Sequence, residues 1–100
     1  MPVSLAEARV LAQNLARRIA TRYPPVIANT PEPVVSKERF EQILEAVFSD
    51  ELERGSRFGF MARFTLGYVL KGKLREIGYG DEFVDFTAKK LGQRLARPDA

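Results

Sequence analysis

The feature that most constrains this chain is residues 57–77, a stretch whose first part, residues 58–70, is apolar on every side of a helix. Between residues 58 and 70 its only charged residue is Arg63. The stretch is too long for one strand and shows no sustained alternation, while Ser56 and Gly78 are suitable residues to cap its two ends. A helix that is apolar all round is a buried one. The sequence therefore predicts a central helix over residues 57–77.

Three aromatic residues recur every fourth position in the first half of this helix and form one stripe: Phe60, Phe64 and Tyr68. We expect this stripe in the core, where Phe64→Ala would cost about 3 to 5 kcal/mol. The second half is merely amphipathic, with a narrow apolar line of Leu66, Leu70, Leu74 and Ile77. The complete predicted core is Phe40, Ile43, Leu44, Val47, Phe60, Phe64, Tyr68, Phe83, Phe86 and Leu91.

A second stripe, Gly59, Arg63 and Gly67, has the same spacing. Each glycine inside a helix costs about 0.5 to 1 kcal/mol relative to alanine, so something should compensate. The favoured reading is close packing of another helix backbone against the glycines. The alternative is a shallow groove in which Arg63 meets a carboxylate or phosphate of a partner. The candidate partner-binding residues are Gly59, Arg63, Gly67, Leu70 and Leu74.

The remaining sequence predicts three further helices in one domain spanning residues 1–100, at 4–22, 36–54 and 81–96. Ser4 and Glu7 have capping-box spacing, Ser36 and Asp81 are expected N-caps, and Gly72 is a candidate kink in the central helix. Because four prolines lie between residues 24 and 33, we expect residues 24–35 to be an extended strap without helix. The fold class predicted is an all-α bundle of about four helices, with the central helix touching the other three.

The chain contains no cysteine and no histidine, which removes the usual zinc ligands, thiol nucleophiles and imidazole catalysts. Two acidic groups, Glu38, Glu41 and Glu45, and Asp81, Glu82 and Asp85, are better explained as a solvated helix face and as helix capping than as metal ligands. No nucleophile can be paired with a base by spacing. We therefore expect no catalytic residues, no metal, no cofactor and no enzymatic activity.

No run of about 18 apolar residues is present, and the first residues lack the pattern of a signal peptide. We expect a cytoplasmic protein without a membrane partner. Residues 36–54 carry three basic and six acidic residues, a net charge of −3, whereas residues 55–80 carry five basic and one acidic, a net charge of +4. These opposite charges favour an antiparallel pair formed by the second and central helices.

The function favoured by the sequence is a protein-interaction or self-associating module, with a homodimer as its simplest form, because the central helix has more apolar surface than its neighbours are expected to cover. The alternative is a small basic nucleic-acid-binding protein that uses Arg17, Arg18, Arg22, Lys71, Lys73 and Arg75. This alternative requires that the fold bring the two groups of cations onto one face. The partner's identity and the oligomeric state are outside what the sequence determines.

Overall fold

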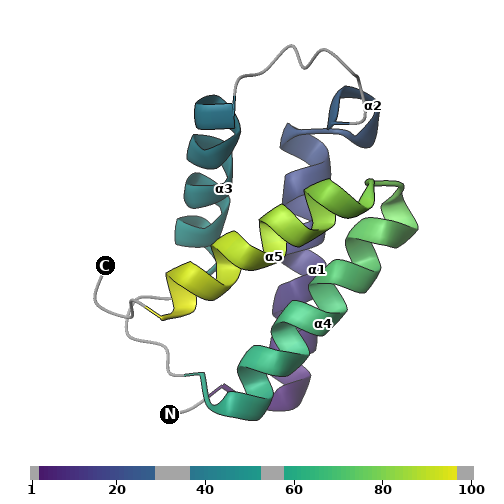
Figure 1. Cartoon of the computed structure of the whole chain (residues 1–100). Helices are drawn as coiled ribbons and strands as arrows, with labels where there is room; N and C mark the ends of the chain where they lie inside the picture. The colour runs from purple at the N-terminus through teal and green to yellow at the C-terminus, as the bar shows by residue number, and fades with distance from the viewer. Residues whose placement is uncertain (1–2, 29–36, 53–57, 97–100) are drawn as a thin grey trace.

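The computed structural model describes residues 3–28, 37–52 and 58–96 (Figure 1). Within these ranges the protein is helical, without strands, which confirms the predicted all-α class. The helices are α1 (Leu5–Arg22), α2 (Pro25–Ala28), α3 (Lys37–Glu51), α4 (Phe60–Ile77) and α5 (Asp81–Leu95). All except α2 are 15 or 18 residues long.

Local sequence signals determine where α1 begins. The Ser4 hydroxyl accepts a hydrogen bond from the Glu7 N–H at 3.1 Å, and the Glu7 carboxylate accepts one from the Ser4 N–H at 3.4 Å. The predicted capping box is thus confirmed.

The short helix α2 lies inside the segment that the sequence predicts to be extended, so the prediction of a strap without helix is wrong for residues 25–28. Pro25 occupies the first position of α2, where the helix needs no backbone N–H. The Ile27 N–H donates to the Pro24 carbonyl at 3.0 Å. Residues 29–36 lie outside the described part of the chain, and with them the rest of the strap and the expected cap Ser36.

Helix α4 begins at Phe60 rather than at residue 57, with Gly59 as its N-cap, whereas the expected cap Ser56 lies outside the described residues. The helix continues through Gly72 without interruption and ends before Gly78. The backbone of Gly78 has a φ of +120°, a conformation that favours glycine. Its N–H donates to the carbonyls of the last turn, which confirms the predicted C-terminal end.

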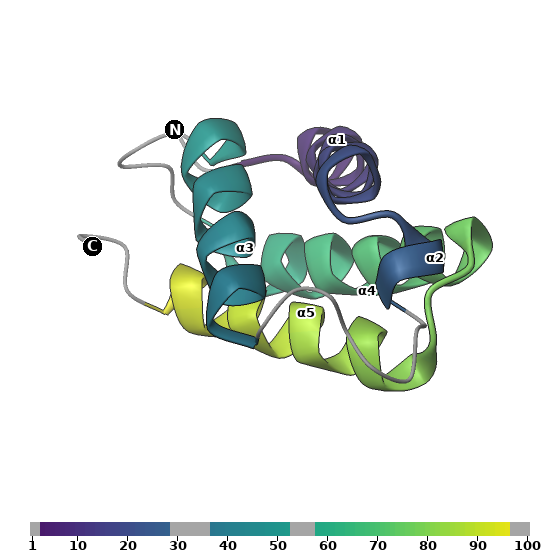
Figure 2. The same ribbon diagram turned by 90° about the horizontal axis from the view of Figure 1, so that it is seen from above.

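The four long helices pack in an arrangement that differs in one respect from the expected one (Figures 1 and 2). Helix α4 lies along α1 and against α5, to which it is joined by the turn at residues 78–80. Helix α3 makes its main contacts with α1 and α5 instead of α4. The expectation that the central helix touches the other three is therefore confirmed for α1 and α5, whereas α3 is not among the main neighbours of α4. Away from their shared turn, α4 and α5 draw apart, so the first half of α4 extends beyond α5 (Figure 1).

The side of α4 that faces the core is aliphatic. Its members, Ala62, Leu66, Leu70 and Leu74, are at most 4% exposed. The aromatic stripe predicted to be buried is instead turned outward: Phe60, Phe64 and Tyr68 are 81%, 61% and 71% exposed. The core prediction is wrong for these three residues. Phe40, Leu44, Val47 and Leu91 are buried as predicted, and Ile43, Phe83 and Phe86 pack against the core while partly exposed.

The composition of α1 gives a physical reason for this orientation. Three of its buried residues, Ala8, Ala12 and Ala16, recur every fourth position and are at most 2% exposed. Small side chains let two helices approach closely, and a close approach has room for leucine and alanine but not for a row of phenylalanine rings. The aliphatic line of α4 is therefore the better match to α1.

The aromatic residues that are buried gather where α1 ends and α3 and α5 begin. The Tyr23 and Phe40 rings lie 4.7 Å apart between centroids, Phe40 and Phe83 4.8 Å, and Phe83 and Tyr79 4.2 Å. The Tyr79 hydroxyl donates to the Tyr23 backbone carbonyl at 2.5 Å. Burial, with a smaller contribution from Tyr23, raises the pKa of Tyr79 to about 12. This cluster joins the turn after α4 to the C-terminal end of α1.

Candidate functional site

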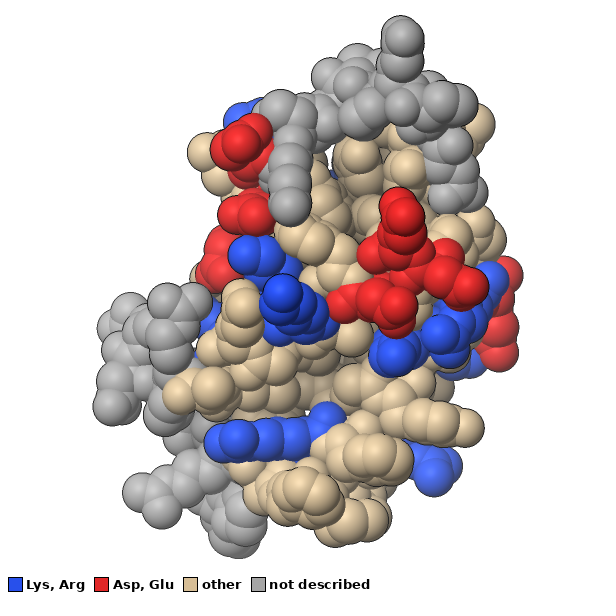
Figure 3. All heavy atoms as spheres, in the orientation of Figure 1, with Lys and Arg blue, Asp and Glu red and all other residues tan. Residues whose placement is uncertain are grey.

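Four large apolar residues share the outward side of the first half of α4, and we call them the aromatic face: Phe60, Met61, Phe64 and Tyr68. Met61, at 56% exposure, is the least exposed of the four. The Phe64 and Tyr68 rings are stacked, with centroids 6.0 Å apart and planes 12° apart. The lower part of the surface in Figure 3, over this half of α4, is mostly uncharged apart from basic side chains, whereas the acidic groups lie above it. The aromatic face is therefore a continuous apolar surface.

The aromatic face is as large as the largest apolar patch expected on a monomer. If a large side chain has about 200 Å² of accessible surface, the four exposed fractions amount to roughly 500 Å². The largest exposed apolar patch on a typical monomer is about 300 to 600 Å² and is often functional. The aromatic face lies near the upper end of that range, so it is the strongest candidate for a functional surface.

The glycine and arginine stripe predicted from the sequence also lies on the outside. A Cβ atom added to Gly59 or Gly67 would meet no atom within 4 Å, so no neighbouring helix packs against these glycines. The favoured reading of this stripe, close helix packing, is therefore wrong. The exposed Arg63 side chain lies beside the aromatic face, where its Nε donates to the Phe58 carbonyl at 3.2 Å.

The other two partner-binding candidates, Leu70 and Leu74, are not at the surface. Both are 0% exposed and belong to the core. The sequence correctly places both leucines on one apolar line of α4, but α1 and α5 cover that line. The prediction is therefore corrected: the candidate surface consists of Gly59, Arg63, Gly67 and the aromatic face, and it does not include Leu70 and Leu74.

The nucleic-acid-binding candidates do not form one unpaired basic surface. Arg18 pairs with Asp50, at 3.5 Å, and with Glu51, both from α3. Lys71 and Arg75 of α4 pair with Asp85 and Asp81 of α5, at 3.4 and 3.5 Å, and Lys73 pairs with Glu76 at 3.3 Å. Arg17 and Arg22 are exposed on α1. Arg18 of α1 thus pairs with carboxylates of α3, whereas Lys71 and Arg75 of α4 pair with carboxylates of α5.

The carboxylates of α3 pair with the helices on either side of it. Besides the Arg18 contacts, Glu41 lies 3.4 Å from Lys90 and Glu45 3.6 Å from Arg94, both on α5. The sequence predicts that the acidic segment packs against the basic central helix, and this pairing is wrong because α1 and α5 supply the cations. Such exposed ion pairs contribute about 0 to 1 kcal/mol each, so they guide packing more than they stabilise it.

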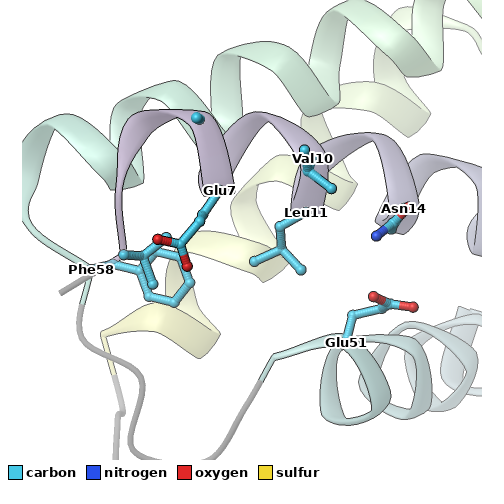
Figure 4. Close-up of a pocket in the computed structure, with 8 residues that line it drawn as sticks. Glu7, Val10, Leu11, Asn14, Glu51 and Phe58 are labelled. Atoms are coloured by element: carbon cyan, nitrogen blue, oxygen red, sulfur yellow. The ribbon is translucent and has the colours of Figure 1, made fainter. Parts of the chain in front are cut away.

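A groove of about 470 Å³ runs along the N-terminal half of α1, between the end of α3 and Phe58 (Figure 4). Its polar residues are Glu7, Asn14 and Glu51. Glu7 is engaged in the capping box and Glu51 in the ion pair with Arg18. The groove therefore presents carboxylates that already have partners, beside Leu11 and other apolar side chains.

Among the described residues, no group of three or more acidic, histidine or cysteine side chains is arranged to hold a metal ion. In the same part of the chain, none of the helices combines the length and the apolar character that crossing a bilayer requires.

Sequence reasoning found the residues of the aromatic face except Met61, but placed them on the wrong side of α4. The sequence feature that could have indicated the buried side is the length of the aliphatic line, since Ala62 extends Leu66, Leu70 and Leu74 by one more turn. Four turns of small and aliphatic residues match the alanine-rich side of α1.

Comparison with known protein families, with curated proteins and with solved structures finds no match to this chain. The aromatic face is therefore the main indication of function.

Proposed function

We propose that this protein is a non-enzymatic interaction module that binds another protein, or a second copy of itself, through the aromatic face of α4. The observation that carries this proposal is the exposure of Phe60, Met61, Phe64 and Tyr68, between 56% and 81%, on one side of one helix. Keeping such side chains in water is unfavourable by about 25 cal/mol per Å². A partner that covers them would recover that free energy.

A role without catalysis is supported by the groove on α1, whose two carboxylates have a capping and an ion-pairing role. The proposed location is the cytoplasm, since a chain without cysteine suits a reducing compartment.

The test is site-specific photocrosslinking in the host cells. A benzoylphenylalanine placed at Phe64 should give a discrete protein adduct, identified by mass spectrometry. The matched control carries the same group at Val10, an apolar residue of α1 that is 56% exposed and lines the groove of Figure 4 rather than the aromatic face. The adduct should disappear when Phe60 and Tyr68 are both changed to serine.

An adduct with a second copy of the chain would support the self-associating form. If position 64 gives no adduct beyond those at position 10, and the protein is monomeric at every concentration in sedimentation, the proposal is refuted.

Nucleic-acid binding is the second candidate and has less support, because Arg18, Lys71, Lys73 and Arg75 each have a carboxylate partner. Fluorescence anisotropy with a labelled single strand and a labelled duplex tests it. Binding that weakens steeply with salt, and that is lost in Arg17→Gln with Arg22→Gln, would favour this candidate over the first.

A further inference from the structure

The cations of α4 differ in whether a carboxylate balances their charge. From Phe60 to Arg75, α4 carries four cations and no carboxylate. Two of these cations, Lys71 and Arg75, are shared with Asp85 and Asp81 of α5, on the far side of Tyr68. Lys73 pairs with Glu76, whereas Arg63 lies beside the rings and donates to the neutral Phe58 carbonyl. Among the described residues, Arg63 is therefore the cation next to the aromatic face that no carboxylate balances.

The start of α4 adds to this positive potential. Its first turn contains no acidic residue, and the N-cap Gly59 has no side chain that accepts a hydrogen bond from the helix. The first N–H groups of a helix carry partial positive charge, which an aspartate or a glutamate usually balances. Here the balancing carboxylate is absent from the helix, at the same end of the face as Phe60 and Arg63.

The area of the aromatic face argues against a second copy as its occupant. A stable dimer buries about 800 Å² per partner, whereas the aromatic face offers roughly 500 Å². A smaller partner that brings a carboxylate to Arg63 fits this area and the unbalanced cation.

The surface beside the rings is also open to a partner. Gly67 lies one helical turn after Arg63, and a Cβ atom there would meet nothing within 4 Å. The backbone is thus uncovered next to the Phe64 and Tyr68 rings. An amphipathic helix places apolar side chains at intervals of three and four residues against such a surface.

We infer that the aromatic face receives a short amphipathic helix of another protein, whose apolar stripe is bordered by carboxylates, one of which pairs with Arg63. This inference rests on the proposed function and names the chemistry of the partner. The apolar stripe covers the Phe64 and Tyr68 rings, and the carboxylate lies at the end where α4 begins.

The experiment compares two designed helical peptides of about 18 residues that have the same leucine stripe, bordered by glutamate in one and by lysine in the other. Binding is measured by calorimetry and mapped by amide chemical shifts. The glutamate peptide should bind the wild-type protein at least about tenfold more tightly than the lysine peptide. Its affinity should fall when salt is raised from about 50 to about 500 mM.

Three variants locate the interaction. Arg63→Gln should lower the affinity for the glutamate peptide about fivefold, which corresponds to the loss of one favourable exposed ion pair. Phe64→Ser should lower this affinity more than about tenfold. The matched control is Lys89→Gln, which removes an exposed cation from α5 and should leave binding unchanged. Circular dichroism checks that each variant remains folded.

Equal binding of the two peptides, or equal binding by Arg63→Gln and the wild type, overturns the inference. A dimer that Phe64→Ser dissociates, with no peptide bound, also overturns it but keeps the proposed function. Attachment to phosphatidylglycerol vesicles that requires Phe64 and Arg63, with neither peptide bound and no protein adduct, overturns both.

Discussion

The orientation of α4 predicts opposite consequences for two neighbouring truncations, Phe64→Ala and Leu66→Ala. Phe64 is 61% exposed, so about 80 Å² of its roughly 200 Å² is covered, which is worth at most about 2 kcal/mol. Alanine is the better helix former by about 0.5 kcal/mol, which offsets part of this loss. We therefore expect Phe64→Ala to lower the free energy of unfolding by no more than about 1.5 kcal/mol.

Leu66 is 0% exposed in the core between α4 and its neighbours. Truncation of such a leucine removes its transfer free energy and leaves a cavity, at a cost of about 3 to 5 kcal/mol. This is a large part of the roughly 5 to 15 kcal/mol that a domain of this kind possesses. The two truncations should thus differ by about 2 kcal/mol or more.

Urea unfolding followed by far-ultraviolet circular dichroism is the suitable assay, because the chain has no tryptophan and a change at Phe64 would disturb tyrosine emission from Tyr68. Equal slopes against urea in both variants would justify comparing the two free energies. A loss of 3 kcal/mol or more for Phe64→Ala, or a smaller loss for Leu66→Ala than for Phe64→Ala, would refute the orientation of α4 and with it the aromatic face.

Two further predictions concern glycines and a buried hydroxyl. Gly67→Ala should stabilise the protein by about 0.5 to 1 kcal/mol in thermal unfolding, since the added methyl group meets open space. Gly78→Ala should destabilise it by about 1 to 3 kcal/mol because of the positive φ of Gly78. If Gly67→Ala destabilised the protein, another helix would have to pack against the glycine stripe. Tyr79→Phe should cost about 1 to 3 kcal/mol at neutral pH, because the Tyr23 carbonyl loses its donor. The wild-type stability should be complete below pH 10 and should fall between pH 10 and 12, since the unfolded chain loses this proton first while burial raises the pKa of Tyr79 to about 12 in the folded state. The fall, at most about 2 to 3 kcal/mol, should be smaller in Tyr79→Phe, and an equal fall in both proteins would contradict the assignment.

The sequence by itself determined the helical class and several helix ends, because these depend on residues a few positions apart. Ser4 and Glu7 close the capping box within one turn. Gly78 ends α4 because a glycine readily takes a positive φ. The wrong prediction for Pro25–Ala28 has an equally local cause, since a proline at the first position of a helix is compatible with it.

Only the tertiary structure decided which side of α4 is buried. A helix with apolar residues all round has no preferred side of its own, so the neighbouring helices choose it. The alanines of α1 accept the line from Ala62 to Leu74 and exclude the larger rings, which leaves Phe60, Phe64 and Tyr68 in solvent. The candidate site is thus a consequence of packing between segments far apart in the sequence, which periodicity within α4 alone does not contain.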